Sequence, residues 1–190
     1  MRLNSPLSPL ERKLVINEVL RWHKRAWTVH TVSVMPDHVH ILATPLEASP
    51  GQWYALSEII RRVKGRSAYE INKWRGRKGS LWLIESYDRI IRSSRDFEEK
   101  FNYIQSNAGV QRLMGSLDEY DGFWCESMEA IPEEVKATPE CPLRPRPPSP
   151  PPHDLTLGKC IPTESPVKTR RRLPHWQIAG STYFIEFGLR

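Results

Sequence analysis

The chain has 190 residues, 39% of them hydrophobic, and a net charge of +6. This length suits one domain of ordinary size with an additional segment, and the basic balance favours a polyanionic partner such as nucleic acid. No apolar run approaches the length of a membrane span, residues 1–9 lack the apolar core of a signal peptide, and the three cysteines show no metal-binding spacing, so we expect a cytoplasmic protein with no membrane partner.

One helix and a strand hairpin are predicted for the first quarter of the chain. Ser8 is a helix cap, Pro9 suits the first turn and Glu11 completes a capping box, so we expect a helix that ends near residue 23. Residues 27–34 alternate in character and are rich in valine and threonine, which is typical of a strand. A Met-Pro-Asp turn then leads into a second predicted strand over residues 38–44.

Two histidines in the second strand form the most informative pattern of the chain. Because alternate side chains of a strand lie on one face, His38 and His40 leave the same side of the sheet. Two neutral imidazoles this close are suited to bind a metal ion. Such pairs also arise by chance, and a strand histidine is more often a polar residue with a hydrogen-bond partner. The turn before His38 favours the metal site, because it places the pair where a site can open to solvent.

The middle of the chain predicts two further helices. Residues 45–55 are expected to form a loop, residues 56–74 an amphipathic helix and residues 81–91 a strand region. The helix over 56–74 carries basic side chains without an opposing acidic cluster, so a phosphate-facing surface is at least as probable as a merely solvated one. These side chains are Arg61, Arg62, Lys64, Arg66 and Lys73.

The next helix, capped by Ser94, holds a tyrosine and an asparagine off its apolar stripe. Tyr103 and Asn107 are four residues apart and therefore share one ridge of the helix. That ridge lies to one side of the stripe formed by Phe97, Phe101, Ile104 and Ala108. Neither residue is placed like a plain core residue, although a tyrosine half-buried at the margin of the core is an equally good interpretation of the helix alone.

The last third of the chain changes in composition. Ten of the 31 residues over 137–167 are proline, so this stretch cannot bury a core, and we expect an extended or disordered linker. A basic run follows, and residues 181–187 predict a strong strand that must join a sheet. We therefore divide the chain into a domain over 1–136, the linker, and a segment over 168–190 that completes the sheet.

Four stretches together resemble the REP-associated tyrosine transposases, a branch of the single-tyrosine HUH transposases. They are residues 34–42 (VMPDHVHIL), 64–67 (KGRS), 86–92 (SYDRIIR) and 103–107 (YIQSN). The resemblance covers most of residues 8–115, and the conjunction of motifs is specific where any single one is not. The family has Asn-Pro after its tyrosine helix. This chain has Asn107-Ala108, which we expect to alter the helix end and not the chemistry.

The resemblance implies a ferredoxin-like α+β fold, an antiparallel sheet with helices on one face, and an enzyme that cuts and rejoins single-stranded DNA near hairpins. Carried over by residue, it implies that His38, His40 and Asn107 bind Mg²⁺ or Mn²⁺. Tyr103 is then the nucleophile, which forms a 5′-phosphotyrosine and a free 3′-hydroxyl, so that rejoining needs no ATP. The implied partner is hairpin DNA, bound by a nucleoid-associated monomer or homodimer.

Further residues are assigned less specific roles. Tyr87 and Tyr69 are the alternative tyrosines, and Tyr87 lacks a paired ligand in its predicted strand. Trp74 and Trp82 have the chemistry to stack on bases, although packing in the core is the expected role of each. The predicted DNA contacts are Arg62, Lys64, Arg66, Arg170, Arg171 and Arg172.

The order of elements departs from the family. Its first strand normally precedes the first helix and follows an Arg-Leu-Pro-His-Trp segment, whereas here residues 172–176 and the strand over 181–187 come last. The order indicates a circular permutation, so we predict that residues 181–187 pair beside the strand over 38–44. Two other interpretations are a truncated tandem copy and strand exchange between two chains.

Two hypotheses from other functional classes remain open. In the first, the chain is a domesticated module that binds nucleic acid without cutting it. In the second, it is a hydrolytic enzyme that uses zinc. The intact set of His38, His40, Tyr103 and Asn107 argues against the first. The absence of a third histidine, cysteine or carboxylate from the motif set argues against the second.

Overall fold

The computed structural model describes residues 5–110, 122–126 and 178–190. Its elements, in chain order, are α1 (Pro9–Leu20), β1 (Trp27–Val34), β2 (His38–Pro45), β3 (Glu47–Ser49), β4 (Gln52–Trp53), α2 (Leu56–Trp74), β5 (Tyr87–Ile90), α3 (Ser94–Val110), β6 (Phe123–Cys125) and β7 (Tyr183–Gly188). The predicted linker over 137–167 and the predicted DNA contacts Arg170, Arg171 and Arg172 lie outside the described residues. Within the described ranges, no helix has the length and apolar character needed to cross a membrane.

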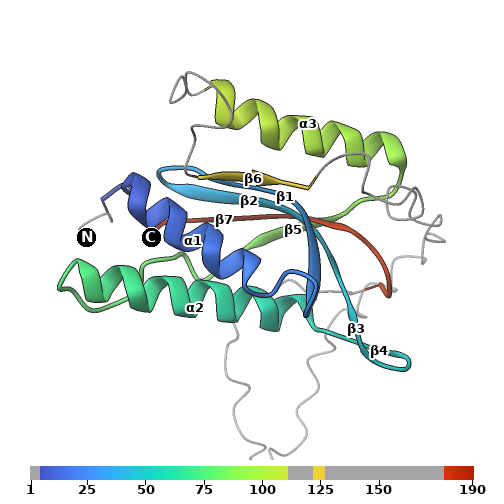
Figure 1. The fold of residues 1–190 in the computed structure, drawn as a ribbon, viewed down its shortest axis with the longest axis horizontal. Coiled ribbons are helices and arrows are strands. Elements are labelled where there is room, and N and C mark those ends of the chain that lie inside the picture. The colour runs from blue at the N-terminus through green and yellow to red at the C-terminus, as the bar shows by residue number, and fades with distance from the viewer. Residues whose placement is uncertain (1–4, 111–121, 127–177) are drawn as a thin grey trace, which may run out of the picture.

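Five strands form one antiparallel sheet in the order β5-β7-β2-β1-β6 (Figure 1). The C-terminal strand β7 lies inside the sheet, because it pairs with β2 on one side and with β5 on the other. The predicted α+β class is confirmed, and so is the pairing of residues 181–187 beside the histidine strand. Strand β7 thus joins elements that are far away in the chain.

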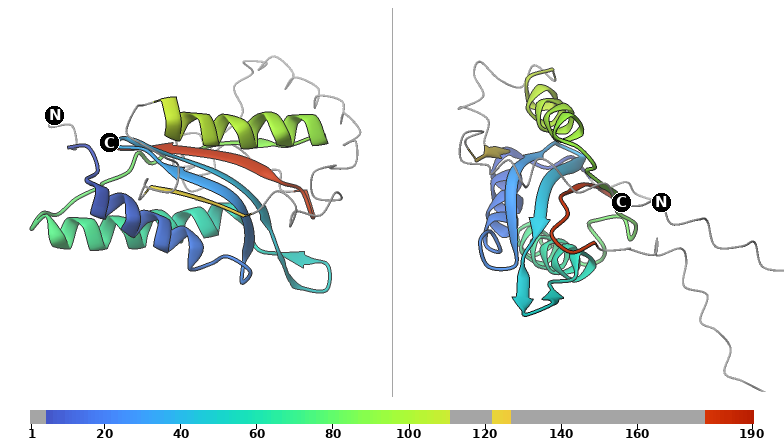
Figure 2. Two further views of the ribbon diagram at one scale, coloured as in Figure 1. Left: turned by 45° about the horizontal axis from the view of Figure 1, so that its top comes forward. Right: turned by 90° about the vertical axis from the view of Figure 1, so that its right-hand side faces the viewer.

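The helices cover both faces of the sheet, so the prediction that they lie on one face is wrong (Figure 2). Val39 and Ile41 point to the face that α1 and α2 cover, whereas Leu42 points to the face that α3 covers. Strand β7 divides in the same way, with Ile185 on the first face and Phe184 on the second. Because these strands are apolar on both sides, each face requires its own helical layer.

The first helix begins where the sequence predicts. Ser8 Oγ accepts a hydrogen bond from the backbone N–H of Glu11, and the Glu11 carboxylate accepts one from the N–H of Ser8 at 2.8 Å. The same carboxylate pairs with Arg75 at the end of α2, at 2.7 Å between Nη2 and Oε2. Helix α1 stops at Leu20, earlier than predicted, and the chain then turns through Lys24, which has a φ of 58°.

Two predicted segments differ from the structure in their extent. The predicted loop over 45–55 holds the short hairpin of β3 and β4, which turns at Gly51 with a φ of 75°. The predicted strand region over 81–91 contains β5 only at Tyr87–Ile90, and Trp82 contributes a single bridge to Leu189. Chain segments this short carry too few alternating residues to define a strand from sequence.

A buried polar relay links the hairpin to the C-terminal strand. His30 Nε2 lies 2.8 Å from Thr44 Oγ1, which lies 2.8 Å from Thr182 Oγ1. His30 is 1% exposed and its ring packs edge-on against Phe97. Burial, and secondarily the charge of His23, lower the pKa of His30 from 6.5 to about 4. The imidazole is therefore neutral in the folded protein at pH 7.

We expect His30 to make the fold sensitive to mild acid. Its pKa is lower in the folded chain than in the unfolded chain, so its contribution is full above pH 6.5 and is lost as the pH falls toward 4. The full loss, reached below pH 4, amounts to about 3 kcal/mol, of which about 2 kcal/mol falls between pH 7.5 and pH 5. Urea unfolding at pH 7.5 and pH 5 should show a smaller drop in unfolding free energy for His30→Gln than for the wild type. Equal drops in the two proteins would contradict this assignment.

Candidate active site

The histidine pair lies at the start of β2, on the face that α3 covers. The two ring centroids are 4.6 Å apart, as the strand spacing predicts. His40 is 2% exposed, whereas the side chain of His38 keeps 26% of its surface accessible. The pair therefore extends from the buried sheet to the solvent.

The two rings have different neighbours. His38 Nδ1 lies 2.6 Å from Asp37 Oδ1, so a proton donated to this carboxylate leaves Nε2 with its lone pair. Burial and then the charge of His38 lower the pKa of His40 to about 4, and Lys100 adds to this shift while Asp37 opposes it. At neutral pH His40 is an uncharged imidazole.

Helix α3 places Tyr103 beside this pair. The Tyr103 ring centroid is 5.5 Å from that of His40 and 6.1 Å from that of Phe184 on β7. Its side chain is 45% exposed, so the phenol stays accessible to a substrate. The structure thus brings together three side chains that the sequence singled out, although 63 residues separate His40 from Tyr103 in the chain.

Lys100 is a member of this cluster that sequence reasoning missed. Its Nζ is 5.6 Å from the Tyr103 ring centroid and 5.2 Å from that of Phe184. The sequence did contain a signal for Lys100, because residues three apart on a helix share a face, and Lys100 and Tyr103 have this spacing. An ammonium here favours a phenolate or a phosphate.

Asn107 lies one helical turn beyond Tyr103 and is half-buried. No hydrogen bond joins it to His38 or His40 within the described part of the chain, so its role as a metal ligand stays a prediction. Nor do the described residues contain a ready-formed group of three or more His, Cys, Asp and Glu side chains for a metal. His40 Nδ1, however, is buried and has no hydrogen-bond partner among the described residues, which fits an imidazole kept for an ion.

Strand β7 adds a carboxylate that the sequence did not reveal. Glu186 is the cross-strand partner of His40, and its Oε2 lies 3.6 Å from His40 Nδ1. No sequence motif marks Glu186, because its place beside His40 depends on the register between two strands far apart in the chain. The active-site cluster is defined here as His38, His40, Tyr103, Lys100 and Glu186.

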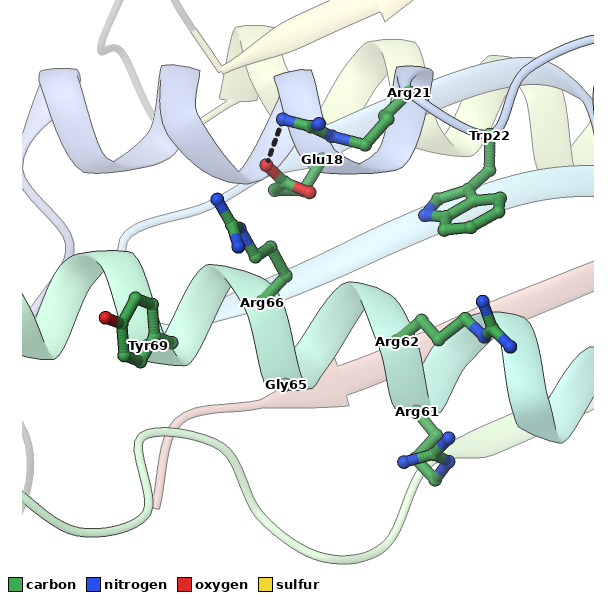
Figure 3. Close-up of a pocket in the computed structure, with 8 residues that line it drawn as sticks. All are labelled: Glu18, Arg21, Trp22, Arg61, Arg62, Gly65, Arg66 and Tyr69. Carbon is green, nitrogen blue, oxygen red and sulfur yellow. Dashed lines mark hydrogen bonds and ion pairs between the residues drawn. The ribbon is translucent and has the colours of Figure 1, made fainter.

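The predicted DNA contacts of α2 lie on the other face of the sheet. Arg62 and Arg66 line an open groove between α1 and α2 (Figure 3). Arg62 lies over the Trp22 ring at 5.3 Å and pairs with Glu58, and Arg66 lies over the Tyr69 ring at 5.9 Å. We call this surface the arginine groove; it also contains Glu18, Arg21, Arg61 and Gly65. The structure does not bring these arginines to the active-site cluster.

Lys64 and the two tryptophans have local partners. The Lys64 ammonium donates to the Ile84 carbonyl at 3.2 Å and to Ser86 Oγ at 3.0 Å, and burial lowers its pKa to about 8. It therefore holds the segment before β5 in this structure. Trp82 is buried as expected, whereas Trp74 is 62% exposed and does not take the core position expected for it.

The comparisons with known proteins agree with this arrangement. The family model described as "Transposase IS200 like" matches residues 11–107, which is 97 of the 190 residues. The matched span runs from α1 to the turn of α3 that carries Tyr103 and Asn107, and it excludes β7. Neither the search of curated proteins nor the search of solved structures gave a match. With more than half of its length matched by this model, the chain belongs to the IS200-like transposase family.

Proposed function

We propose that this transposase cuts and rejoins single-stranded DNA near hairpins through a 5′-phosphotyrosine on Tyr103. The observation that carries the proposal is the contact between His40 on β2 and Tyr103 on α3, with ring centroids 5.5 Å apart. An exposed phenol next to two imidazoles combines a nucleophile with a metal-binding pair.

The reaction follows from these side chains. Tyr103 Oη loses its proton and attacks the phosphorus, and the bond from phosphorus to the 3′ oxygen breaks. That oxygen takes up a proton and leaves as a 3′-hydroxyl, while the 5′ phosphate stays on Tyr103. A phenol is mostly protonated at neutral pH, so its attack requires positive charge nearby. The Lys100 ammonium, 5.6 Å from the ring, supplies such a charge. Attack by a 3′-hydroxyl on the phosphotyrosine reverses these steps.

His38 and His40 would hold a divalent ion, Mg²⁺ or Mn²⁺, with Asn107 as the third ligand that the family resemblance implies. Such an ion supplies Lewis-acid chemistry, because it polarises a phosphate oxygen and stabilises the charge that develops on it. The buried Nδ1 of His40, which has no hydrogen-bond partner among the described residues, supports this assignment.

The arginine groove supports a separate DNA contact. Arg62 and Arg66 combine exposed guanidinium groups with the aromatic rings of Trp22 and Tyr69, which is a pattern that suits phosphates and unpaired bases. Because the groove and the active-site cluster are on opposite faces, it also favours the second candidate function, a module that binds DNA without cutting it. The association with REP sequences, which the family resemblance implies, is part of the proposed transposase function.

Metal removal separates the two candidate functions. Purified protein is mixed with a pool of single-stranded hairpin DNA and Mn²⁺, and a denaturing gel detects covalent complexes. We expect an adduct that is lost with excess EDTA and returns when Mn²⁺ is restored. DNA that binds under native conditions but gives no adduct at any metal concentration would support the binding module and contradict the enzyme.

A further inference from the structure

Strand register places a carboxylate next to the histidine pair. Glu186 is the direct cross-strand partner of His40, and Gly188 is that of His38. Directly opposed side chains leave the same face of a sheet, so Glu186 shares the face of both histidines. A hollow lies beside Gly188, where β2 begins and β7 ends. Its lining includes Asp37, His38, Glu186, Gly188, Leu189 and Arg190.

The unpaired nitrogen of His40 faces this carboxylate. His40 Nδ1 is buried without a hydrogen-bond partner in the described ranges, and such a group costs about 1–3 kcal/mol when nothing compensates it. Glu186 Oε2 lies 3.6 Å away, which is too far for a hydrogen bond. Two ligand atoms that each lie about 2.1 Å from one ion, at 90–120° to each other, are separated by roughly 3.0–3.6 Å. The separation fits two ligands of one ion.

We propose that Glu186 is a ligand of the divalent ion that His38 and His40 bind. This inference rests on the proposed function and adds a ligand from the C-terminal strand to those that the family resemblance implies. A carboxylate is the oxygen ligand that Mg²⁺ and Mn²⁺ prefer, and it offsets their charge where an asparagine does not. Among the described residues these three side chains do not yet form a ready-made metal site. The Glu186 side chain is 44% exposed, so it can change rotamer and close the site as the ion binds.

Strand β7 then has two functions, because it completes the sheet and supplies a metal ligand. The alternative role for Glu186 is that of a positioning residue, which orients the His40 ring through an Nδ1–H hydrogen bond. Glutamine keeps an acceptor oxygen for that hydrogen bond and loses the charge of a metal ligand. The substitution Glu186→Gln therefore separates the two roles.

The test measures the binding of Mn²⁺ alone, by calorimetry on the full chain without DNA. We expect Glu186→Gln to raise the Kd for Mn²⁺ at least tenfold and Glu186→Asp to raise it less. Water-proton relaxation of the bound Mn²⁺ should report an additional coordinated water in Glu186→Gln. Glu98→Gln, an exposed glutamate on α3, is the matched control and should leave the Kd unchanged. Thermal unfolding without metal checks that each variant is folded.

The outcomes distinguish this inference from the proposed function. If the wild type binds Mn²⁺ and Glu186→Gln binds it with the same Kd and water count, Glu186 is not a ligand, whereas the metal site of His38 and His40 stands. If the wild type does not bind Mn²⁺, the inference and the metal-dependent part of the proposed function fail together.

Discussion

Tyr103→Phe is expected to abolish the covalent adduct with DNA while leaving the fold and DNA binding intact. The substitution removes one oxygen atom, and the ring keeps its contacts with His40 and Phe184. Because the side chain is 45% exposed, we expect less than about 0.5 kcal/mol of change in unfolding free energy. Loss of the nucleophile should lower adduct formation on the order of 10³-fold or more. A denaturing gel with Mn²⁺ measures the adduct, and a native gel measures binding.

Tyr87→Phe is the matched control for this prediction. Tyr87 lies on β5 opposite Glu186, its ring is 6.4 Å from that of Phe184, and it is 52% exposed. It thus shares the face of the active-site cluster, and an unspecific effect of losing a phenol there would appear in both variants. Full adduct formation by Tyr103→Phe with its loss in Tyr87→Phe would reassign the nucleophile.

Deletion of residues 178–190 is expected to unfold the domain. The deletion removes β7 and leaves β2 and β5 without the strand that joins them. It also removes the buried side chains of Tyr183, Phe184, Ile185 and Phe187. Each contributes about 1.5–3 kcal/mol, so their sum is comparable to the whole stability of a typical domain. Size-exclusion chromatography and circular dichroism should show an aggregated or unfolded product.

The same deletion tests how the C-terminal strand is used. A truncated protein that stays monomeric and unfolds cooperatively would show that β7 is dispensable, as expected for the remnant of a tandem copy. If the full chain is a dimer that loses its dimeric state only together with β7, strand exchange between two chains is the better account. The permutation remains our interpretation, because residues 172–176, which carry part of its evidence, lie outside the described residues.

Local sequence patterns were sufficient for much of the fold. The capping box at Ser8 and Glu11 places the start of α1, and alternation places β1, β2 and β7 to within about two residues. The histidine pair was predictable for the same reason, since two residues at a spacing of two in a strand must share a face. The position of Tyr103 beside His40 followed from the family resemblance and not from periodicity.

Long-range geometry explains what the sequence did not reveal. The placement of α3 on the second face depends on Leu42 and Phe184, whose burial on that side is visible only once β2 and β7 are paired. Glu186 depends on the same register. Lys64 differs from these residues, because its charge drew attention to it in the sequence. That charge suggested a phosphate contact, whereas in the structure its ammonium donates to the Ile84 carbonyl. Charge alone does not tell a solvated cation from one that holds a loop.

In the proposed reaction, Tyr103, the side chain next to His40 on α3, takes up the DNA phosphate. The most direct test is to isolate the Mn²⁺-dependent adduct, digest its protein and DNA, and locate the attached nucleotide by mass spectrometry. We expect a 5′-phosphate ester on the peptide that contains Tyr103, with a free 3′-hydroxyl on the released strand. A nucleotide attached to the peptide that contains Tyr87, or cleaved DNA without any protein-linked nucleotide, would contradict it.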